Sequence, residues 1–423
     1  MNKIKVLIFP AGEVNSIELH DALSTCVNVE VWGASSIDRH GPYVFKNYVS
    51  GLPFISDENF IEKLNNLIQL KDISVIFPTH DSVALFLSEH RDKIKAKIIV
   101  ASKKTTELCR DKLLTYRFFS NVDFVPTLYE NAISYPAFIK PREGQGSVGA
   151  RVIHSYSDIE NIDLSKFVVT EYLPGDEYTV DCFTDKNGKL LFVSPRTRAR
   201  TMAGISVAGE TIPLKDEFKA IATVLNSSLD FFGLWWFQVK RDKNGKLKLL
   251  EISTRCAGTM ALTRSLGVNL PLLSVYAVLG YEVKIEKNDY ISRMDSSLIR
   301  RYSIDIKYKE VYIDFDDTII INGKVYLKAI WFLYQCINNK VPVNLLTRHE
   351  NKIFDTLNKY RIPNTLFKRI INVPDGKAKS DFIENRESIF IDNSFTERSE
   401  VKNTLNIPTF DVDGLDFLMD WRF

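Results

Sequence analysis

The first hundred residues alternate between short apolar runs and amphipathic segments, and this alternation constrains the fold more than any other feature of the sequence. Apolar runs typical of strands lie at residues 4–9, 27–35, 73–79 and 96–102. Segments with helical periodicity lie between them, at residues 16–26, 57–70 and 81–94. Strands and helices that alternate at this spacing predict a parallel, doubly wound sheet. No G-x-G-x-x-G sequence follows the first strand, so a dinucleotide site is not indicated.

The same alternation returns near the end of the chain, after a long segment of a different kind. Residues 104–290 are rich in strands and Gly-containing turns, and residues 281–310 are charged and poor in long apolar runs. A chain of 423 residues is long enough for two to four structural units. We therefore predict a mixture of α/β and α+β architecture in three domains, at residues 1–103, 104–307 and 308–423.

Composition and charge narrow the class of protein. The chain is 45% hydrophobic with a net charge of +2, so nothing indicates nucleic acid or a membrane surface as a partner. The five cysteines form no C-x-x-C pair and the six histidines form no cluster, which argues against disulfides and a zinc site. The first apolar run ends at Pro10 and no stretch approaches the ~20 residues of a spanning helix. We expect a soluble cytoplasmic protein that acts on small molecules, and the sequence leaves a homodimer open.

Two segments in the middle of the chain indicate a nucleotide site. In "FIKPREGQGSVGARV", a strand delivers Lys140 to a loop that contains Gly144, Gly146 and Ser147, and glycines let backbone N–H groups approach phosphate closely. In "KFVVTEYLPGDEYTVD", a strand ends at Glu171, Tyr172 and Leu173, whose backbone could meet an adenine edge, and the Glu177 carboxylate could accept from a ribose. The alternatives are an ordinary hairpin loop with a surface lysine, and a plain turn at Pro174-Gly175.

A third segment, "LWWFQVKRDKNGKLKLLEISTR", predicts a hairpin with a polar pair across it. Asn244-Gly245 is a strong two-residue turn signal, and that turn would place Gln238 opposite Glu251 and Lys240 opposite Leu249. An amide oxygen and a carboxylate held this close are suitable ligands for Mg²⁺. The alternative is a polar pair on the solvent side of the hairpin.

In the order and spacing of these motifs, residues 1 to about 307 resemble the ATP-grasp superfamily, in its carbamoyl-phosphate-synthase-like branch. The resemblance implies a parallel pre-ATP-grasp sheet followed by an ATP-grasp domain. It also assigns roles: basic phosphate contacts at Lys112 and Lys140, an adenine hinge at Glu171 to Leu173, a ribose carboxylate at Glu177, and metal ligands at Gln238, Glu251 and Ser253. The family's usual E-x-N-x-R reads "EISTR" here, with Ser253 where asparagine is common and Arg255 at its end.

The reaction that the resemblance implies proceeds through an acyl phosphate. ATP, with Mg²⁺ or Mn²⁺, phosphorylates a carboxylate, and an amine then displaces the phosphate. Arg255 would hold the carboxylate or the developing oxyanion, and Arg264 could reach the same site. The stretch 195–211 carries Arg196, Arg198 and Arg200 between glycines, which we interpret as a mobile basic loop that closes over an anionic substrate. The alternative is a solvated basic turn.

Polar residues end three successive apolar strands after residue 308. "VYIDFDDTII" ends in Asp314 and Asp316, "VNLLTRHE" in Thr347, and "SIFIDNSFTE" in Asp392 and Asn393. Because ligands bind at the carboxyl ends of parallel strands, these side chains indicate one site for an anion and a metal. Lys377 and Lys379 lie between the second and third strands.

These motifs resemble the haloacid dehalogenase (HAD) phosphatase superfamily across residues 308 to about 420. The resemblance implies a small Rossmannoid domain and an Mg²⁺-dependent phosphatase that works through a phosphoaspartate. Only residues 321–324 separate the first motif from the next helix, which leaves no room for a large cap. It also assigns roles: Asp314 as nucleophile, Asp316 as acid and base, Thr318 as the end of the first motif, Thr347 as phosphoryl contact, Lys379 (or Lys377) as the motif lysine, and Asp314, Asp316 and Asp392 as metal ligands.

The leading hypothesis from the sequence is a bifunctional enzyme, an ATP-dependent carboxylate–amine ligase joined to a phosphatase that could dephosphorylate the ligase's substrate or product. A second hypothesis makes the last domain a non-catalytic binding or dimerisation module, which Asn393 favours because many relatives have a second acid there. A third makes the first part a kinase that stops at the phosphorylated product.

Overall fold

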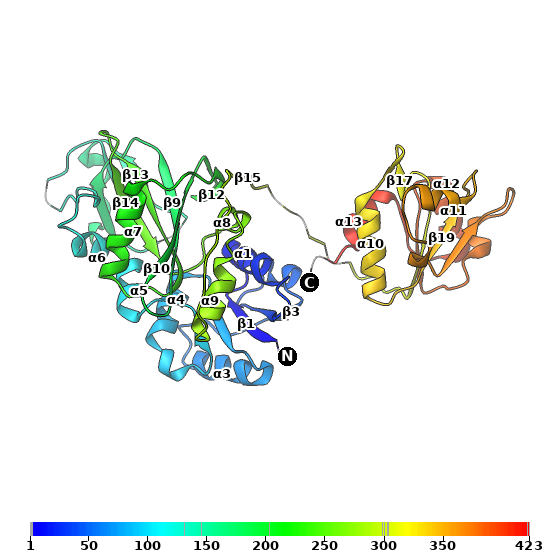
Figure 1. Ribbon diagram of the computed structural model, residues 1–423, viewed down its shortest axis with the longest axis horizontal. Helices are drawn as coiled ribbons and strands as arrows, with labels where there is room; N and C mark the ends of the chain where they lie inside the picture. Colours follow the sequence, from blue (N-terminus) through cyan, green and yellow to red (C-terminus); the bar gives the residue numbers. More distant parts are fainter. Residues whose placement is uncertain are drawn as a thin grey trace. The chain divides into compact units, whose positions relative to one another are not determined.

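The computed structural model divides into two compact units, residues 1–298 with residue 423, and residues 299–422 (Figure 1). It describes residues 3–130, 132–144, 146–202, 204–297, 299, 301–302, 304–420 and 422. The predicted boundaries at residues 103 and 307 stay predictions.

The first unit begins with the predicted parallel sheet, in the order β3-β2-β1-β4-β5. The apolar run of β1 makes it the central strand, which is paired in parallel with β2 and β4 and covered on both faces. The short strand β3 is an addition that the sequence analysis missed. The elements are β1 (Ile4–Phe9), α1 (Val14–Leu23), β2 (Val29–Ala34), α2 (Gly41–Val44), β3 (Asn47–Val49), α3 (Phe60–Lys71), β4 (Val75–Pro78), α4 (Asp81–Glu89) and β5 (Lys97–Ile98).

Three antiparallel sheets and five helices follow in the same unit. Their orders are β7-β6-β8, β10-β9-β13-β14 and β11-β12-β15. The elements are α5 (Lys103–Arg110), α6 (Lys112–Phe118), β6 (Ala137–Pro141), β7 (Arg151–Ile153), β8 (Phe167–Glu171), β9 (Glu177–Thr184), β10 (Leu190–Thr197), β11 (Arg200–Met202), β12 (Ile205–Glu210), α7 (Asp216–Ser228), β13 (Gly233–Arg241), β14 (Leu247–Ser253), α8 (Ala261–Ser265), α9 (Leu270–Val278) and β15 (Arg293–Asp295).

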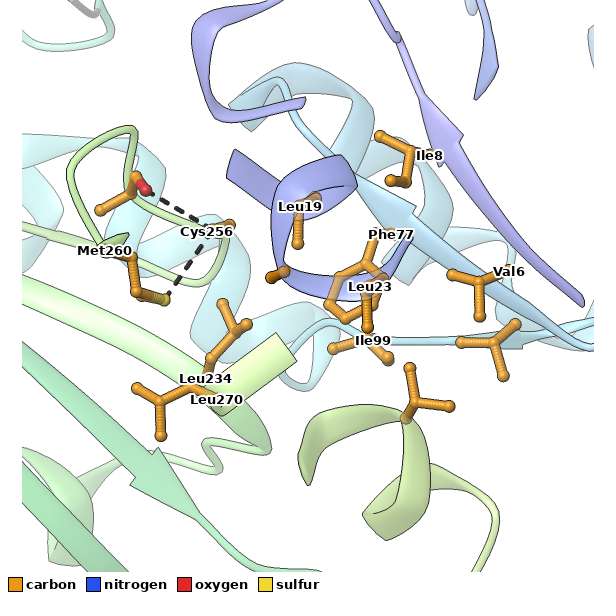
Figure 2. Packing of buried hydrophobic residues seen from close by; sticks show 14 of the residues in the cluster. Val6, Ile8, Leu19, Leu23, Phe77, Ile99, Leu234, Cys256, Met260 and Leu270 are labelled. Carbon is orange, nitrogen blue, oxygen red and sulfur yellow. Dashed lines mark hydrogen bonds between the residues drawn. The ribbon is translucent and has the colours of Figure 1, made fainter. Parts of the chain in front are cut away.

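The two faces of β13 have different neighbours, because successive side chains of a strand point to opposite sides. Trp235, Phe237 and Val239 pack in one core cluster with side chains of α7, including Phe218 and Ile221. On the other face, Leu234 and Trp236 join a cluster that includes Val6, Ile8 and Phe77 of the first sheet and Leu270 of α9. Figure 2 shows this second cluster, in which side chains from the start of the chain lie beside Leu234, Cys256 and Leu270. The first sheet and the antiparallel sheet therefore share one core.

The hairpin of β13 and β14 corrects one part of the sequence prediction and confirms another. The loop is three residues long, because Asp242 N donates to Lys246 O at 2.9 Å and Gly245 adopts φ +78°. Lys240 consequently pairs with Lys248, and the predicted pair with Leu249 is wrong. A β-bulge on β14 then shifts the register by one residue, so that Gln238 does pair with Glu251 as predicted.

Most of the stretch 195–211 forms strands where the sequence predicted a loop, while its movement over a substrate stays a prediction. Residues 195–197 end β10, and Arg200–Met202 and Ile205–Glu210 form β11 and β12. Gly204, at the β11–β12 turn, has φ +73° and lies so close to Gly146 that a Cβ there would sit 2.2 Å from the Gly146 carbonyl. The turn therefore packs directly against the glycine loop after β6.

The second unit contains a five-stranded parallel sheet in the order β20-β19-β16-β21-β22. Val311 and Ile313 pack on one face with side chains of α10, α11 and α13, and Tyr312 packs on the other with side chains of α12. The elements are β16 (Glu310–Ile313), β17 (Ile320–Ile321), β18 (Lys324–Val325), α10 (Leu327–Asn338), β19 (Val343–Thr347), α11 (Ile353–Lys359), β20 (Arg369–Asn372), β21 (Ser388–Ile391), α12 (Phe395–Leu405), β22 (Thr409–Phe410) and α13 (Leu415–Leu418). In the part of the chain that the structure describes, no helix is long and apolar enough to cross a membrane.

Candidate functional site

The first unit contains a cavity of about 290 Å³ that gathers every residue predicted to bind the nucleotide. These residues come from separate parts of the fold, namely the start of α6, β6 and the glycine loop after it, the end of β8 and the segment after it, and the start of β9. The predicted residues that line it are Lys112, Lys140, Gly144, Gly146, Ser147, Glu171, Tyr172, Leu173, Glu177, Gln238 and Glu251. The cavity is thus the place where the separate motifs of the sequence meet.

Lys140 projects from β6 into a network that contains no carboxylate. Its Nζ donates to the Tyr116 hydroxyl at 2.6 Å and to the Leu250 carbonyl at 3.0 Å, and Tyr116 itself donates to the same carbonyl at 2.6 Å. Leu250 is the extra residue of the β14 bulge, so its carbonyl is not needed for the strand pairing. Burial, followed by the nearby Lys112 ammonium, lowers the pKa of Lys140 to about 7.

A chain of charged contacts forms the floor between β13, β14 and β9. Lys112 Nζ lies 3.5 Å from a Glu251 oxygen and donates to the Gly144 carbonyl at 3.3 Å. Gln238 donates to Glu251 at 3.2 Å and accepts from Arg198 at 2.8 Å, and Arg198 also pairs with Glu177 at 2.7 Å. Because both Gln238 and Glu251 already have protein partners, a bound nucleotide would have to compete for these contacts or share them.

A second cavity of about 190 Å³ adjoins the first, and Arg255 lies in its wall. The Arg255 guanidinium forms a two-point ion pair with Asp81 of α4 at 2.9 and 3.0 Å, and Ser253 donates to Asp81 at 3.2 Å. Burial alone would raise the pKa of Asp81, but Arg255 and Arg110 together lower it below its ordinary value. Lys112, Gly146, Arg198, Gln238 and Glu251 are among the residues that line both cavities. A ligand in the first cavity would therefore contact a ligand in the second cavity beside these side chains.

The other three arginines predicted to bind substrate each form an ion pair with a different acidic residue. Arg196 is 1% exposed and pairs with the fully buried Asp181 at 2.9 Å, although it also lines the second cavity. Arg200 is an exposed partner of Asp295, and Arg264 pairs with Glu18 at 3.0 Å. Neither Arg200 nor Arg264 lines either cavity. The substrate role of all three stays a prediction.

The predicted metal ligands of the first unit fit a resident metal ion only in part. Glu251 offers a carboxylate, which suits Mg²⁺, but the Gln238 amide oxygen accepts from Arg198 and Ser253 is bonded to Asp81. Within the described ranges no group of three or more His, Cys, Asp or Glu side chains is placed to hold a metal ion. We therefore treat Mg²⁺ here as part of the nucleotide substrate.

The second unit brings together the strand-end residues that the sequence singled out. Lys379 is 2% exposed, and its Nζ donates to Asp314 at 2.8 Å and to Asp392 at 2.6 Å. Burial, together with the neighbouring Asp392 carboxylate, raises the pKa of Asp314 to about 6 despite the nearby Lys379 ammonium. Lys377, the alternative lysine, is exposed. Asp314 and Asp392, two hard carboxylates side by side, would suit a divalent cation.

The remaining predicted residues surround this pair. The Thr318 hydroxyl lies 3.5 Å from an Asp314 carboxylate oxygen and accepts from the Asn393 backbone N–H at 3.2 Å. The Thr347 hydroxyl is fully buried with no partner among the described residues. The Asp316 carboxylate contacts His349 Nδ1 at 2.8 Å, and its role as acid and base stays a prediction. His349 Nε2 in turn contacts the Thr356 hydroxyl at 2.7 Å.

Sequence reasoning missed Tyr116, Asp81 and His349. Tyr116 and Asp81 contact residues that are 24 and 174 positions away in the chain, so no local spacing marks them. His349 alone follows a predicted motif directly, at the end of β19, and could have been noted as a strand-end polar residue.

The comparisons with known proteins identify the class of the first unit. Residues 163–299 match the family described as "ATP-grasp in the biosynthetic pathway with Ter operon". The biotin carboxylase domain of Hydrogenobacter thermophilus 2-oxoglutarate carboxylase, solved with MgADP, ADP and bicarbonate, is similar in fold, with a TM-score of 0.57 and 16% identity over 69% of this chain and 74% of its own. This part of the protein therefore has the ATP-grasp fold, as predicted from the sequence.

Among curated proteins, the chain is similar to two kinds of ligase. It is 22% identical over 239 residues to 3-methyl-D-ornithine–L-lysine ligase of Methanosarcina mazei, covering 55% of this chain and 62% of that one. It is 26% identical over 174 residues to D-alanine–D-alanine ligase of Thermotoga maritima, covering 36% and 56%. The chain thus spans less than two thirds of each relative. The family match ends at residue 299, and the HAD resemblance of residues 308 to 420 stays a prediction.

Proposed function

We propose that the first unit is an ATP-dependent carboxylate–amine ligase. The observation that carries this proposal is the convergence of all nine predicted nucleotide contacts on one cavity, which adjoins a second cavity lined by Arg255. ADP in a solved structure of the same fold, and the ligase names of the relatives, support it. A carboxylate and an amine are accordingly its proposed substrates.

In this proposal the nucleotide phosphates lie beside the glycine loop, Lys112 and Lys140. A carboxylate oxygen in the second cavity attacks the terminal phosphorus, the bond to ADP breaks, and an acyl phosphate forms. The amine then attacks the carbonyl carbon, loses a proton to solvent, and phosphate leaves. The ammonium groups and Arg255 offset the charge that develops on the transferred oxygens.

The test is ADP release from the purified full-length protein over pairs of carboxylates and amines, including phosphorylated ones. A ligase releases ADP only when both partners are present, whereas a kinase needs one. Lys140→Met should abolish the signal and Lys243→Met, an exposed change in the hairpin loop, should retain it. Amine-independent ADP release would replace the ligase proposal with the kinase.

For the second unit we propose a phosphatase, on the observation that Lys379 holds Asp314 and Asp392 together at the carboxyl ends of β16 and β21. Asp314 would attack phosphorus, while Asp316 would protonate the leaving oxygen and later activate water. Mg²⁺ held by Asp314 and Asp392 would offset the charge of the phosphoryl oxygens. The alternative, a non-catalytic binding module, is favoured by Asn393 alone.

Asp314→Asn separates these possibilities in the full-length protein. A phosphatase hydrolyses a generic aryl phosphate with Mg²⁺ present and loses this activity in the variant, whereas a binding module shows no hydrolysis in either form. If the phosphatase acts on the ligase's own substrate or product, the wild type should release a second phosphate for each ADP and the variant should not. Identical phosphate counts in the two proteins would refute that link.

A further inference from the structure

Two adjacent tryptophans on β13 have opposite hydrogen-bonding states. Trp235 faces α7, and its indole N–H donates to the Thr184 hydroxyl at 2.8 Å. Trp236 faces the other way, is 5% exposed and lines the second cavity, and its indole N–H has no acceptor among the described residues. A buried donor without an acceptor is unfavourable, so its place beside a cavity calls for an explanation.

The hydroxyl of Thr179 on β9 is a second buried donor without a described partner, and Thr179 lines the same cavity as Trp236. It is 1% exposed, lines the second cavity, and its hydroxyl has no partner among the described residues. Thr179 pairs directly with Gln238, two residues along β13 from Trp236, so both side chains are on one face of the sheet. Two unpartnered donors from neighbouring strands therefore occur in one cavity wall.

The chemistry of this wall selects an anionic oxygen acceptor. An indole N–H can only donate, so its missing partner must accept. A carboxylate, whose oxygens only accept, is the acceptor that the proposed ligase reaction supplies. Five cationic and three anionic side chains line the cavity, and each cationic one already belongs to an ion pair. The cationic side chains are Arg110, Lys112, Arg196, Arg198 and Arg255, and the anionic ones are Glu13, Asp81 and Glu251. The Arg255 guanidinium also lies over the Trp236 ring, 5.6 Å from its centre.

We propose that the Thr179 hydroxyl and the Trp236 indole N–H bind the substrate carboxylate that is phosphorylated, beside Arg255. This inference rests on the proposed ligase function and names the residues that recognise its acid substrate. The position suits the reaction, since Thr179 is opposite Gln238, which lines both cavities. One carboxylate oxygen can then accept these hydrogen bonds while the other attacks the nucleotide.

The kinetic test uses hydroxylamine as a generic amine, because it converts an acyl phosphate into a hydroxamate that is measured by colour. Acetate, D-alanine, L-alanine and L-lysine are tried with the wild type and ATP, and the best acid is then used with Thr179→Val and Trp236→Phe. Each change should raise KM for the acid about tenfold to hundredfold and leave KM for ATP unchanged. Equal KM values for the acid in variants and wild type would overturn the proposal.

A stability measurement tests the same inference without catalysis. Trp235→Phe and Trp236→Phe remove the same atoms from neighbouring positions, but only the first breaks a hydrogen bond. Trp235→Phe should lower the thermal midpoint of the ligand-free protein clearly more than Trp236→Phe. An equal loss would show that the Trp236 N–H has a partner within the protein and would overturn the proposal.

Failure of the ligase proposal would be seen separately, as no hydroxamate from the wild type with any acid. Whether the site binds a carboxylate is then tested by thermal shift with the same four acids. Stabilisation of the wild type but not of Thr179→Val supports the site, and no stabilisation of the wild type overturns it.

Discussion

Replacing Lys140 by methionine should stabilise the ligand-free protein while it removes nucleotide binding. The lysine is buried against Tyr116 and Leu250 without a carboxylate, and its pKa falls from 10.5 to about 7. The folded protein therefore holds the charged amine less favourably than the unfolded chain does. The resulting penalty is largest below pH 7 and disappears as the pH rises through 10.5.

The size of the effect follows from the two pKa values. At pH 7.5, about three pH units below the unfolded value, the penalty is on the order of 4 kcal/mol. Methionine fills a similar volume but leaves the Tyr116 and Leu250 oxygens without this donor, which costs about 1–2 kcal/mol. We expect a net stabilisation of roughly 2–3 kcal/mol at pH 7.5 and a much smaller one, or a loss, at pH 10.

The assay is urea unfolding of the full-length protein at pH 7.5 and pH 10, following the transition of the first unit. Lys243→Met, in the exposed hairpin loop, is the matched control and should change stability by less than about 0.5 kcal/mol. The reasoning would be refuted if Lys140→Met were less stable than the wild type at pH 7.5, or if its advantage did not shrink toward pH 10. An ATP analogue should stabilise the wild type and not the variant.

Other predictions concern the same contacts. Nucleotide binding to the wild type should take up most of a proton at pH 8 and almost none at pH 6, because phosphate restores the charge of the amine that is neutral at pH 8; calorimetry in buffers of different ionisation enthalpy measures this. Asp81→Asn should destabilise the first unit by about 2–4 kcal/mol at pH 7, since it removes the carboxylate that forms a two-point ion pair with Arg255, and the difference should narrow in acid as Asp81 of the wild type protonates. Thr347→Val should leave the thermal midpoint unchanged, because that hydroxyl has no partner among the described residues, yet abolish aryl phosphate hydrolysis; a large loss of stability would contradict the proposed phosphoryl contact.

The sequence predicted the strands, helices and fold of the first unit well because these depend on local patterns. Four of the five strands of the first sheet are close to where apolar runs placed them, and the parallel sheet and ATP-grasp fold are confirmed. The pairing of Gln238 with Glu251 is also confirmed, although its reasoning was wrong in part. A three-residue loop shifts the register, and the bulge at Leu250 restores it.

The arginines show where local patterns stop being informative. Arg196, Arg198 and Arg200 alternate along one stretch and look equivalent in the sequence. In the fold, Arg196 is fully buried with Asp181, Arg198 joins the floor of both cavities, and Arg200 is exposed beside Asp295. Their partners come from other strands, which no spacing within the stretch can indicate.

The sequence by itself determined which segments become strands, where each motif ends, and which polar residues follow each strand. Only the tertiary structure decided how those residues are partnered: Arg255 with Asp81, Lys140 with Tyr116, Asp316 with His349, and the Trp236 indole N–H with no acceptor among the described residues. The physical reason is the distance along the chain over which each kind of interaction acts. Apolar periodicity acts between near neighbours in the chain, whereas the energy of a buried charge or donor depends on groups brought to it from distant segments.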